Sequence, residues 1–305
     1  MARLVLGSRG SELARTQTGL AVSALRGAWP DLEIETRIIT TSGDERSSKL
    51  VDPKAGRKGL FTAEIERALL AGEIDVAVHS AKDLPSDAPP ELEICGALPR
   101  GLVEDVLITK RPASPSLGEG DVLATGSVRR QCQMRWKYPR VEIVDLRGNV
   151  PTRLRKLVES DWTGIVLAGA GLERLGCQIR DGKFVYESAA LSAQMLDPEQ
   201  FVPAGGQGII ALQVRRTDAQ AGRFVRTIND PQTLACLEAE REFLHLLQGD
   251  CDSPVGALAI AAAGRLRLRA QVFDPPGIAP RMGCVEGEIA RGKALARELW
   301  EKING

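Results

Sequence analysis

The sequence has few aromatic residues, only two histidines and no long hydrophobic segment. No run approaches the roughly 18 apolar residues that a membrane-spanning helix needs. Only three apolar residues separate Arg3 from Gly7, which is too short for the core of a signal peptide. We therefore expect a soluble, cytoplasmic protein that has no membrane partner.

The six cysteines form no C-x-x-C pair, and the two histidines add no zinc-ligand spacing. We therefore predict free thiols and no metal site. Five cysteines lie among apolar neighbours and are predicted to be inert core residues. Cys251 differs, because it lies in the polar segment Gly-Asp-Cys-Asp. His79 and His245 both follow apolar residues and are predicted to pack in the structure rather than to act as bases.

The charges balance, with 40 basic and 40 acidic residues, which argues against a nucleic-acid-binding surface. Arginine accounts for 30 of the 40 basic residues. Its planar guanidinium binds a carboxylate or phosphate through two hydrogen bonds, which an ammonium group cannot match. A GC-rich genome would explain the same ratio, so the positions of the arginines decide between the two explanations.

Strand-like and helix-like segments alternate through the first two thirds of the chain. Residues 4–6, 34–38 and 74–78 are predicted to be strands, and helices are predicted to begin near Ser11 and Phe61. This β-α-β-α-β order is typical of a largely parallel sheet covered by helices.

The alternation restarts at Val106, which predicts a second α/β lobe. The strand expected at 208–214 could return to either lobe. The last part of the chain changes character: a long helix at 231–247 is followed by two strands, at 255–262 and 266–273, and by a terminal helix near 287–302. This order predicts a smaller α+β domain.

Arginines gather where predicted strands lead into predicted helices. Such junctions bind ligands in open α/β sheets, and helix N-termini attract anions. A single arginine there would most simply be a solvated surface residue, but the same placement recurs at five junctions. The ligand is therefore predicted to carry several carboxylates or phosphates. A nucleotide is disfavoured, because residues 54–59 lack the G-K-[ST] ending of a phosphate loop. The arginines are Arg9, Arg129, Arg130, Arg147, Arg153 and Arg174.

Asp83 follows a predicted strand and precedes Leu-Pro. A carboxylate in such a turn can simply accept hydrogen bonds from nearby backbone N–H groups. The functional alternative is a carboxylate at the carboxyl end of a strand that moves protons and stabilises a cationic intermediate.

Short motifs follow one another along nearly the whole chain. They are GSRGS at 7–11, KGLF at 58–61, AVHSAKDLP at 77–85, GSVRRQCQ at 126–133, LRGN at 146–149, TRL at 152–154, GAGLERLG at 169–176, PAGGQG at 203–208, EREFL at 240–244 and GDCDSPVG at 249–256. In this order and spacing, the chain resembles the porphobilinogen deaminase (hydroxymethylbilane synthase) family.

The resemblance implies a transferase of tetrapyrrole and heme biosynthesis. Such an enzyme joins four porphobilinogen molecules head to tail into hydroxymethylbilane and releases an ammonia at each step. Each pyrrole carries an acetate and a propionate, which would explain the arginines at the junctions. The family works as a monomer, so small-molecule porphobilinogen is the expected partner.

The resemblance also implies a fold of two periplasmic-binding-protein-like α/β lobes plus a smaller C-terminal α+β domain. Residues 1–99 with 202–216 would form the first lobe, which bears Asp83. Residues 103–200 would form the second lobe. Residues 220–305 would form the C-terminal domain, which bears the cysteine that carries the cofactor.

By similarity, Cys251 would carry a dipyrromethane cofactor through a thioether, and Asp83 would be the catalytic carboxylate. Asp83 would assist loss of the amine, stabilise the azafulvenium-like cation and help remove the α-proton. Residues 41–59 would form a lid. The cofactor would be bound by Lys58, Asp83, Ser127, Arg129, Arg130 and Arg147. The substrate would be bound by Arg9, Ser11, Arg147, Arg153 and Arg174.

The sequence departs from the family beside Cys251, where the second of two usual glycines is replaced by Asp250. Together with Asp252, this carboxylate is expected to raise the pKa of Cys251 and to slow cofactor attachment. The main alternative function is a non-catalytic two-lobed protein that binds a polycarboxylate, since the fold alone does not decide function. Such a protein needs neither Asp83 nor Cys251.

Overall fold

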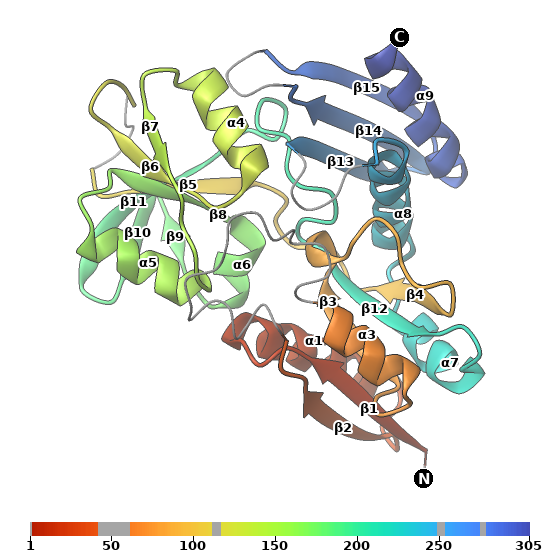
Figure 1. Cartoon of the computed structure of the whole chain (residues 1–305). Helices are drawn as coiled ribbons and strands as arrows, with labels where there is room; N and C mark the ends of the chain where they lie inside the picture. The colour runs from red at the N-terminus through yellow and green to blue at the C-terminus, as the bar shows by residue number, and fades with distance from the viewer. Residues whose placement is uncertain (1, 42–61, 112–116, 249–253, 275–278) are drawn as a thin grey trace.

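The computed structural model describes residues 2–41, 62–111, 117–248, 254–274 and 279–305. Within these residues the chain forms three sheets in three separate bodies (Figure 1). Lys58, Cys251 and nearly all of the lid predicted at 41–59 lie outside the described residues.

The first lobe has the strand order β2-β1-β3-β12-β4. Strand β1 is parallel to β2 and β3, whereas β12 is antiparallel to both β3 and β4. The strand expected at 208–214, whose lobe the residues alone left open, is therefore part of the first lobe. The elements are β1 (Arg3–Ser8), α1 (Glu12–Ala28), β2 (Glu33–Ile38), α3 (Ala63–Leu70), β3 (Val76–Ser80), a 3₁₀ turn (Ala81–Asp83), β4 (Leu92–Ala97), β12 (Ile210–Arg215) and α7 (Ala219–Thr227).

The strands β1, β3 and β12 of the first lobe are buried on both faces, because helices cover each side, whereas the edge strand β2 is not. Leu4 and Leu6 belong to one core with α1, whereas Val5 belongs to a second core with α3. Alternate side chains of a strand point to opposite faces, so one short apolar run supplies both cores.

Helix α7 packs in the first lobe, although residues 220–305 were expected to form the C-terminal domain. Phe224 and Val225 lie in the same core as Leu4 and Leu212. The ring of Phe224 also meets that of Trp29 edge-on, with 5.1 Å between centroids. The apolar face of an amphipathic helix can be predicted from the sequence, but the sheet against which that face packs cannot.

The second lobe has the strand order β7-β6-β8-β5-β11-β10-β9. Strands β7, β6 and β8 are parallel neighbours, and the remaining strands pair antiparallel. The antiparallel run β9–β11 was not predicted. The elements are β5 (Asp105–Thr109), β6 (Val122–Ala124), α4 (Val128–Lys137), β7 (Glu142–Val144), α5 (Val150–Glu159), β8 (Gly164–Ala168), α6 (Gly169–Arg174), β9 (Ile179–Arg180), β10 (Lys183–Tyr186) and β11 (Ala189–Met195).

The C-terminal domain is an antiparallel sheet, β13-β14-β15, with two helices packed on it. One strand more than predicted is present, since β15 occupies residues that were partly assigned to the last helix. One of its inward positions is Gly283, where a Cβ would lie 2.7 Å from Leu299 Cδ1 of the last helix. Because no larger apolar side chain fits there, the strand lacks the alternating apolar pattern by which it could have been predicted. The elements are α8 (Pro231–Leu246), β13 (Val255–Ala262), β14 (Arg265–Val272), β15 (Arg281–Glu288) and α9 (Gly292–Asn304).

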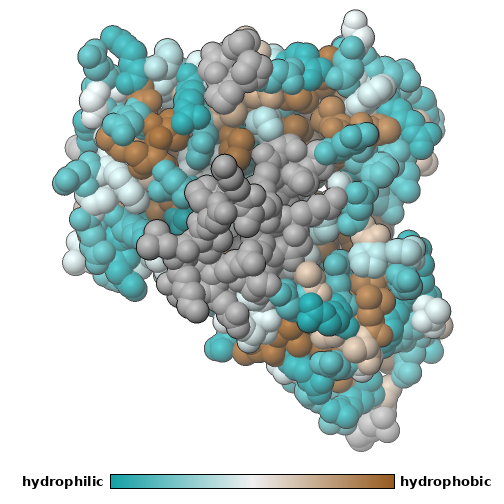
Figure 2. Space-filling model, in the orientation of Figure 1, coloured by the Kyte–Doolittle hydropathy of each residue, from teal (hydrophilic) through white to brown (hydrophobic). Residues whose placement is uncertain are grey.

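The predicted fold class of two α/β lobes and a smaller α+β domain is confirmed. Among the described residues, no helix is both long enough and apolar enough to span a membrane. Away from the grey segments, the face shown in Figure 2 is mostly hydrophilic, with hydrophobic residues in small patches.

Candidate functional site

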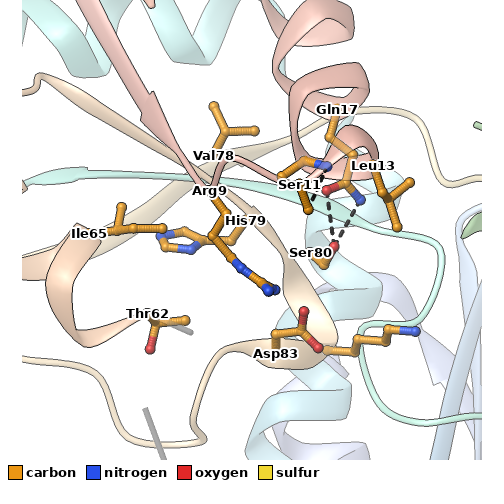
Figure 3. Close-up of a pocket in the computed structure, with 12 residues that line it drawn as sticks. Arg9, Ser11, Leu13, Gln17, Thr62, Ile65, Val78, His79, Ser80 and Asp83 are labelled. Carbon is orange, nitrogen blue, oxygen red and sulfur yellow. Dashed lines mark hydrogen bonds between the residues drawn. The ribbon is translucent and has the colours of Figure 1, made fainter. Parts of the chain in front are cut away.

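The site begins where β1 and β3 end at the same edge of the first sheet. Because these strands are parallel neighbours, Arg9 and the turn that contains Asp83 leave the sheet side by side. The two side chains point toward one another in Figure 3. They line a cavity of about 500 Å³, part of it open to solvent, together with Ser11, Gln17 and Lys82.

The second lobe completes the site through an adjoining cavity of about 280 Å³. Gln17 and Lys82 line both cavities, and Arg174 enters the second from α6. Nη2 of Arg174 donates to the carbonyl oxygen of Gly208 at 2.6 Å, so this arginine also contacts the segment that returns to the first lobe. The cavity therefore lies between the lobes.

Positive charge accumulates at this boundary. Burial, together with Arg130 and Arg153, lowers the pKa of Lys82 to about 8, against the opposing effect of Asp83 and Asp105. Burial likewise lowers the pKa of Arg153 to about 10, with Arg130 and Arg147 acting in the same direction and Asp83 opposing them. Cations of the second lobe thus act directly on the Lys82–Asp83 turn of the first lobe. An anionic ligand would relieve their mutual repulsion.

Arg129 and Arg130 are only 3% and 5% exposed and share one carboxylate, Asp105. Nη2 of Arg129 lies 2.8 Å from Asp105 Oδ2, and Nη2 of Arg130 lies 2.7 Å from Oδ1. Burial alone would raise the pKa of Asp105, but the two guanidinium groups hold it well below its usual range. One carboxylate between two arginines leaves a net positive charge. Among the described residues, Nε of each arginine has no hydrogen-bond partner.

The remaining predicted residues make local contacts at the starts of helices α1 and α4 and in the second lobe. Ser11 and Ser127 cap α1 and α4 by accepting the backbone N–H groups of Ala14 and Arg130. Nε of Arg153 donates to the carbonyl oxygen of Gly148 at 2.6 Å. Arg147 is half exposed, and its Nε pairs with Asp145 Oδ2 at 2.6 Å.

The structure thus brings Arg9, Ser11 and Asp83 into one cavity and Arg174 into the next. It places Arg153 within electrostatic range of Asp83, and Arg130 within electrostatic range of Lys82 and Arg153. Arg129 faces the segment between the lobes, where its Nη1 donates to the carbonyl oxygen of Val202 at 3.0 Å. Lys58 and Cys251 lie outside the described residues.

Three residues of the site were not singled out in the sequence. Lys82 could have been found, because it precedes Asp83 within the motif at 77–85. Gln17 lies inside the first helix, and its Nε2 is 2.9 Å from the hydroxyl oxygen of Ser80. Asp105 opens an apolar strand, where an acidic residue is expected to be solvated. Nothing in the sequence shows that two buried arginines meet it.

The two histidines behave differently. His79 is 4% exposed, and its Nε2 lies 3.1 Å from Oε1 of Gln213, so its predicted packing role is confirmed. The prediction for His245 is wrong. Its side chain is 60% exposed, with Nδ1 2.8 Å from Asp87 Oδ1, because the last turn of α8 turns this residue away from the core.

We predict that His79 makes the protein less stable in acid. Burial lowers the pKa of His79 to about 4, against 6.5 for the free side chain. Between these values the unfolded chain binds a proton that the folded chain rejects, so stability falls as the pH falls from 6.5 to 4, by about 3 kcal/mol. Urea unfolding of wild type and His79→Asn across this range measures the contribution. Parallel pH profiles for the two proteins would contradict it.

Comparison with protein-family models gives two matches. Residues 4–223 match the model described as porphobilinogen deaminase, dipyromethane cofactor binding domain, and residues 234–304 match that of the porphobilinogen deaminase C-terminal domain. Curated relatives are similar over nearly their whole length. The chain is 39% identical to the porphobilinogen deaminase of Roseiflexus castenholzii over 97% of this chain and 95% of that protein. It is also 39% identical to that of Syntrophomonas wolfei, over 99% and 96%.

Solved structures give weaker matches. The methionine-binding protein MetQ covers 76% of this chain and 92% of its own at 15% identity, with a TM-score of 0.43. The effector-binding domain of BenM with benzoate covers 75% and 96%, also at 15% identity and a TM-score of 0.43. Scores this low do not establish a shared fold.

Proposed function

The chain belongs to the porphobilinogen deaminase family, the hydroxymethylbilane synthases, and is a transferase; we propose that it joins four porphobilinogen molecules head to tail on a dipyrromethane cofactor linked to Cys251. The observation that carries the proposal is Asp83 facing Arg9 in a first-lobe cavity, with Arg174 of the second lobe in the adjoining cavity and Arg153 of the second lobe within electrostatic range of Asp83. A single carboxylate among many guanidinium groups suits substrates that carry several acids and react through a cation.

The residues present fit a dipyrromethane. Its acetate and propionate groups suit the three neighbouring cations Lys82, Arg130 and Arg153, which lie within electrostatic range of one another. The Nε atoms of Arg129 and Arg130 are donors without a protein acceptor among the described residues. When bound, the cofactor supplies the pyrrole to which the first substrate is joined. The proposed cofactor-binding residues are Lys58, Asp83, Ser127, Arg129, Arg130 and Arg147. The proposed substrate-binding residues are Arg9, Ser11, Arg147, Arg153 and Arg174.

Asp83 carries the proposed chemistry. Its carboxylate stabilises positive charge on the substrate pyrrole as the amine leaves, and it accepts or returns a proton during the condensation. Arg9 faces this carboxylate across the cavity and binds acids of the substrate beside it. Cys251 would hold the cofactor through a thioether: its thiolate would attack the methylene carbon of a pyrrole from which the amine has left as ammonia, an electron-poor centre that thiolates attack readily.

The experiment is a product assay on the purified chain. With porphobilinogen as the only substrate, we expect hydroxymethylbilane and ammonia in a ratio of one to four. Binding of porphobilinogen without release of ammonia would instead support the non-catalytic polycarboxylate-binding protein. We also propose that the protein is a cytoplasmic monomer. The monomer is supported by a cleft that the lobes of one chain form on their own.

We predict that Arg153→Leu weakens substrate binding far more than Arg155→Leu. Arg153 is half-buried beside Asp83 and Arg130, whereas Arg155 lies two residues on and is exposed. Loss of a charge-assisted hydrogen bond costs about 1.5–3 kcal/mol, so KM should rise about 10- to 100-fold in Arg153→Leu alone. Steady-state kinetics measure this. Equal KM values in the two variants would remove Arg153 from the binding site.

A further inference from the structure

Two sequence motifs that take no part in the proposed chemistry meet in the interior. They are PAGGQG at 203–208, between the lobes, and EREFL at 240–244, on α8 of the C-terminal domain. The contact is Glu240, whose side chain is fully buried and whose Oε2 accepts the backbone N–H of Gly206 at 2.6 Å. The first motif is thereby held by a residue of another domain.

Both carboxylate oxygens of Glu240 accept hydrogen bonds. Arg100 donates to it from Nη1 at 2.7 Å and from Nη2 at 3.3 Å. The backbone N–H of Ala259 in β13 donates to it at 2.7 Å. The carboxylate thus connects the C-terminal sheet, the segment that leaves the first lobe and the segment that returns to it.

Gly206 in turn lies against the Ala81–Asp83 turn, which carries the proposed catalytic residue. Its φ is +76°, and a Cβ there would lie 2.9 Å from both Ala81 C and Lys82 N. Close by, the backbone N–H of Ala81 donates to the carbonyl oxygen of Ile209 at 3.0 Å. The loop therefore lies directly against the backbone of the turn that ends in Asp83.

Arg100 connects Glu240 to the second lobe through Gln207. Its Nε donates to the carbonyl oxygen of Gln207 at 2.9 Å. The side chain of Gln207 is buried, and its Nε2 donates to Asp105 Oδ1 at 2.9 Å. Asp105 in turn holds Arg129 and Arg130.

We propose that Glu240 is a positioning residue for the condensation, which sets the Lys82–Asp83 turn through Gly206 and the Arg129–Arg130 pair through Arg100, Gln207 and Asp105. The inference rests on the proposed function. Glu240 itself does not reach the cavity. Replacing the carboxylate of Glu240 by an amide removes its charge and one of its two acceptor oxygens, so the hydrogen bonds from the Arg100 guanidinium and the Gly206 N–H weaken together.

The test compares Glu240→Gln with Glu242→Gln in the full-length, cofactor-loaded enzyme. Glu242 is a matched control: it lies two residues on in the same helix, its side chain is 17% exposed, and it pairs with Arg297 within the C-terminal domain. Small displacements of catalytic groups have large effects on rate, so kcat of Glu240→Gln should fall about 10- to 100-fold, at a temperature where both variants are folded. Glu242→Gln should keep the wild-type kcat.

A second variant, Gln207→Met, separates the two connections and provides a test if Glu240→Gln does not fold. Methionine matches the volume of glutamine but cannot bind Asp105. We expect KM to rise about tenfold because the arginine pair is displaced, while kcat stays near wild type. Wild-type kcat in loaded, folded Glu240→Gln, or wild-type KM in Gln207→Met, would overturn the proposal. Failure of the proposed function is distinct, since wild type and Glu242→Gln would then release no ammonia.

Discussion

Asp83→Asn should lose nearly all turnover while its cofactor stays attached. The substitution keeps the shape of the side chain and removes the negative charge that faces Arg9 in the cavity. Preorganised charge at a developing opposite charge is worth about 10²- to 10³-fold in kcat, and we expect a loss of this order. The amide also cannot accept a proton from the substrate, which removes acid–base assistance as well.

Asp87→Asn is the matched control for this prediction. Asp87 lies four residues on, is 58% exposed and pairs with the exposed His245. Ammonia release measured on equal amounts of cofactor-loaded protein should be normal in Asp87→Asn. Near-normal release in Asp83→Asn would remove Asp83 from the chemistry and would favour a protein that binds its ligand without converting it.

Cys251→Ser should make a folded protein that forms no hydroxymethylbilane. A serine hydroxyl is a far weaker nucleophile than a thiolate toward the methylene carbon, so the thioether cannot form. Without a tethered pyrrole there is nothing to extend, and we expect kcat to fall below detection rather than by a small factor. The thermal unfolding midpoint measured beside the activity separates loss of the cofactor from loss of the fold.

Cys284→Ser is the control for the cysteine prediction. Cys284 belongs to the same domain and is half-buried, and its sulfur accepts a hydrogen bond from Nε of Arg267 at 3.3 Å. This variant should keep both activity and cofactor. Product formation by Cys251→Ser would show that the cofactor is attached elsewhere or is not needed.

The fold could be predicted in its layers but not in all of its connections. Apolar runs such as 4–6 are buried on both faces, so the alternation of strands and helices was visible in the sequence. Strand β15 was missed because its inward positions include Gly283 and Gly287, which lie against Leu299 and Leu295. Helix α7 was assigned to the wrong domain because part of the core in which it packs, including Leu4 and Trp29, lies near the N-terminus of the chain.

The site could be predicted where it depends on local position. Arg9 and Asp83 both follow strands of one sheet, so their convergence follows from the topology. The burial of Arg129 and Arg130 in helix α4 does not, because it depends on Asp105, which lies more than 20 residues away in strand β5. The position of Lys82 beside Asp83 was visible in the motif, but its lowered pKa was not, since that arises from burial and then from Arg130 and Arg153 of the other lobe.

The most direct measurement is the intact mass of the purified, active wild-type chain, before and after brief exposure to porphobilinogen. The expected mass is that of the sequence plus one dipyrromethane, located on the peptide that contains Cys251, with further pyrrole units added after exposure. A fully active preparation whose mass equals that of the bare sequence would contradict growth of the product on a covalently held cofactor.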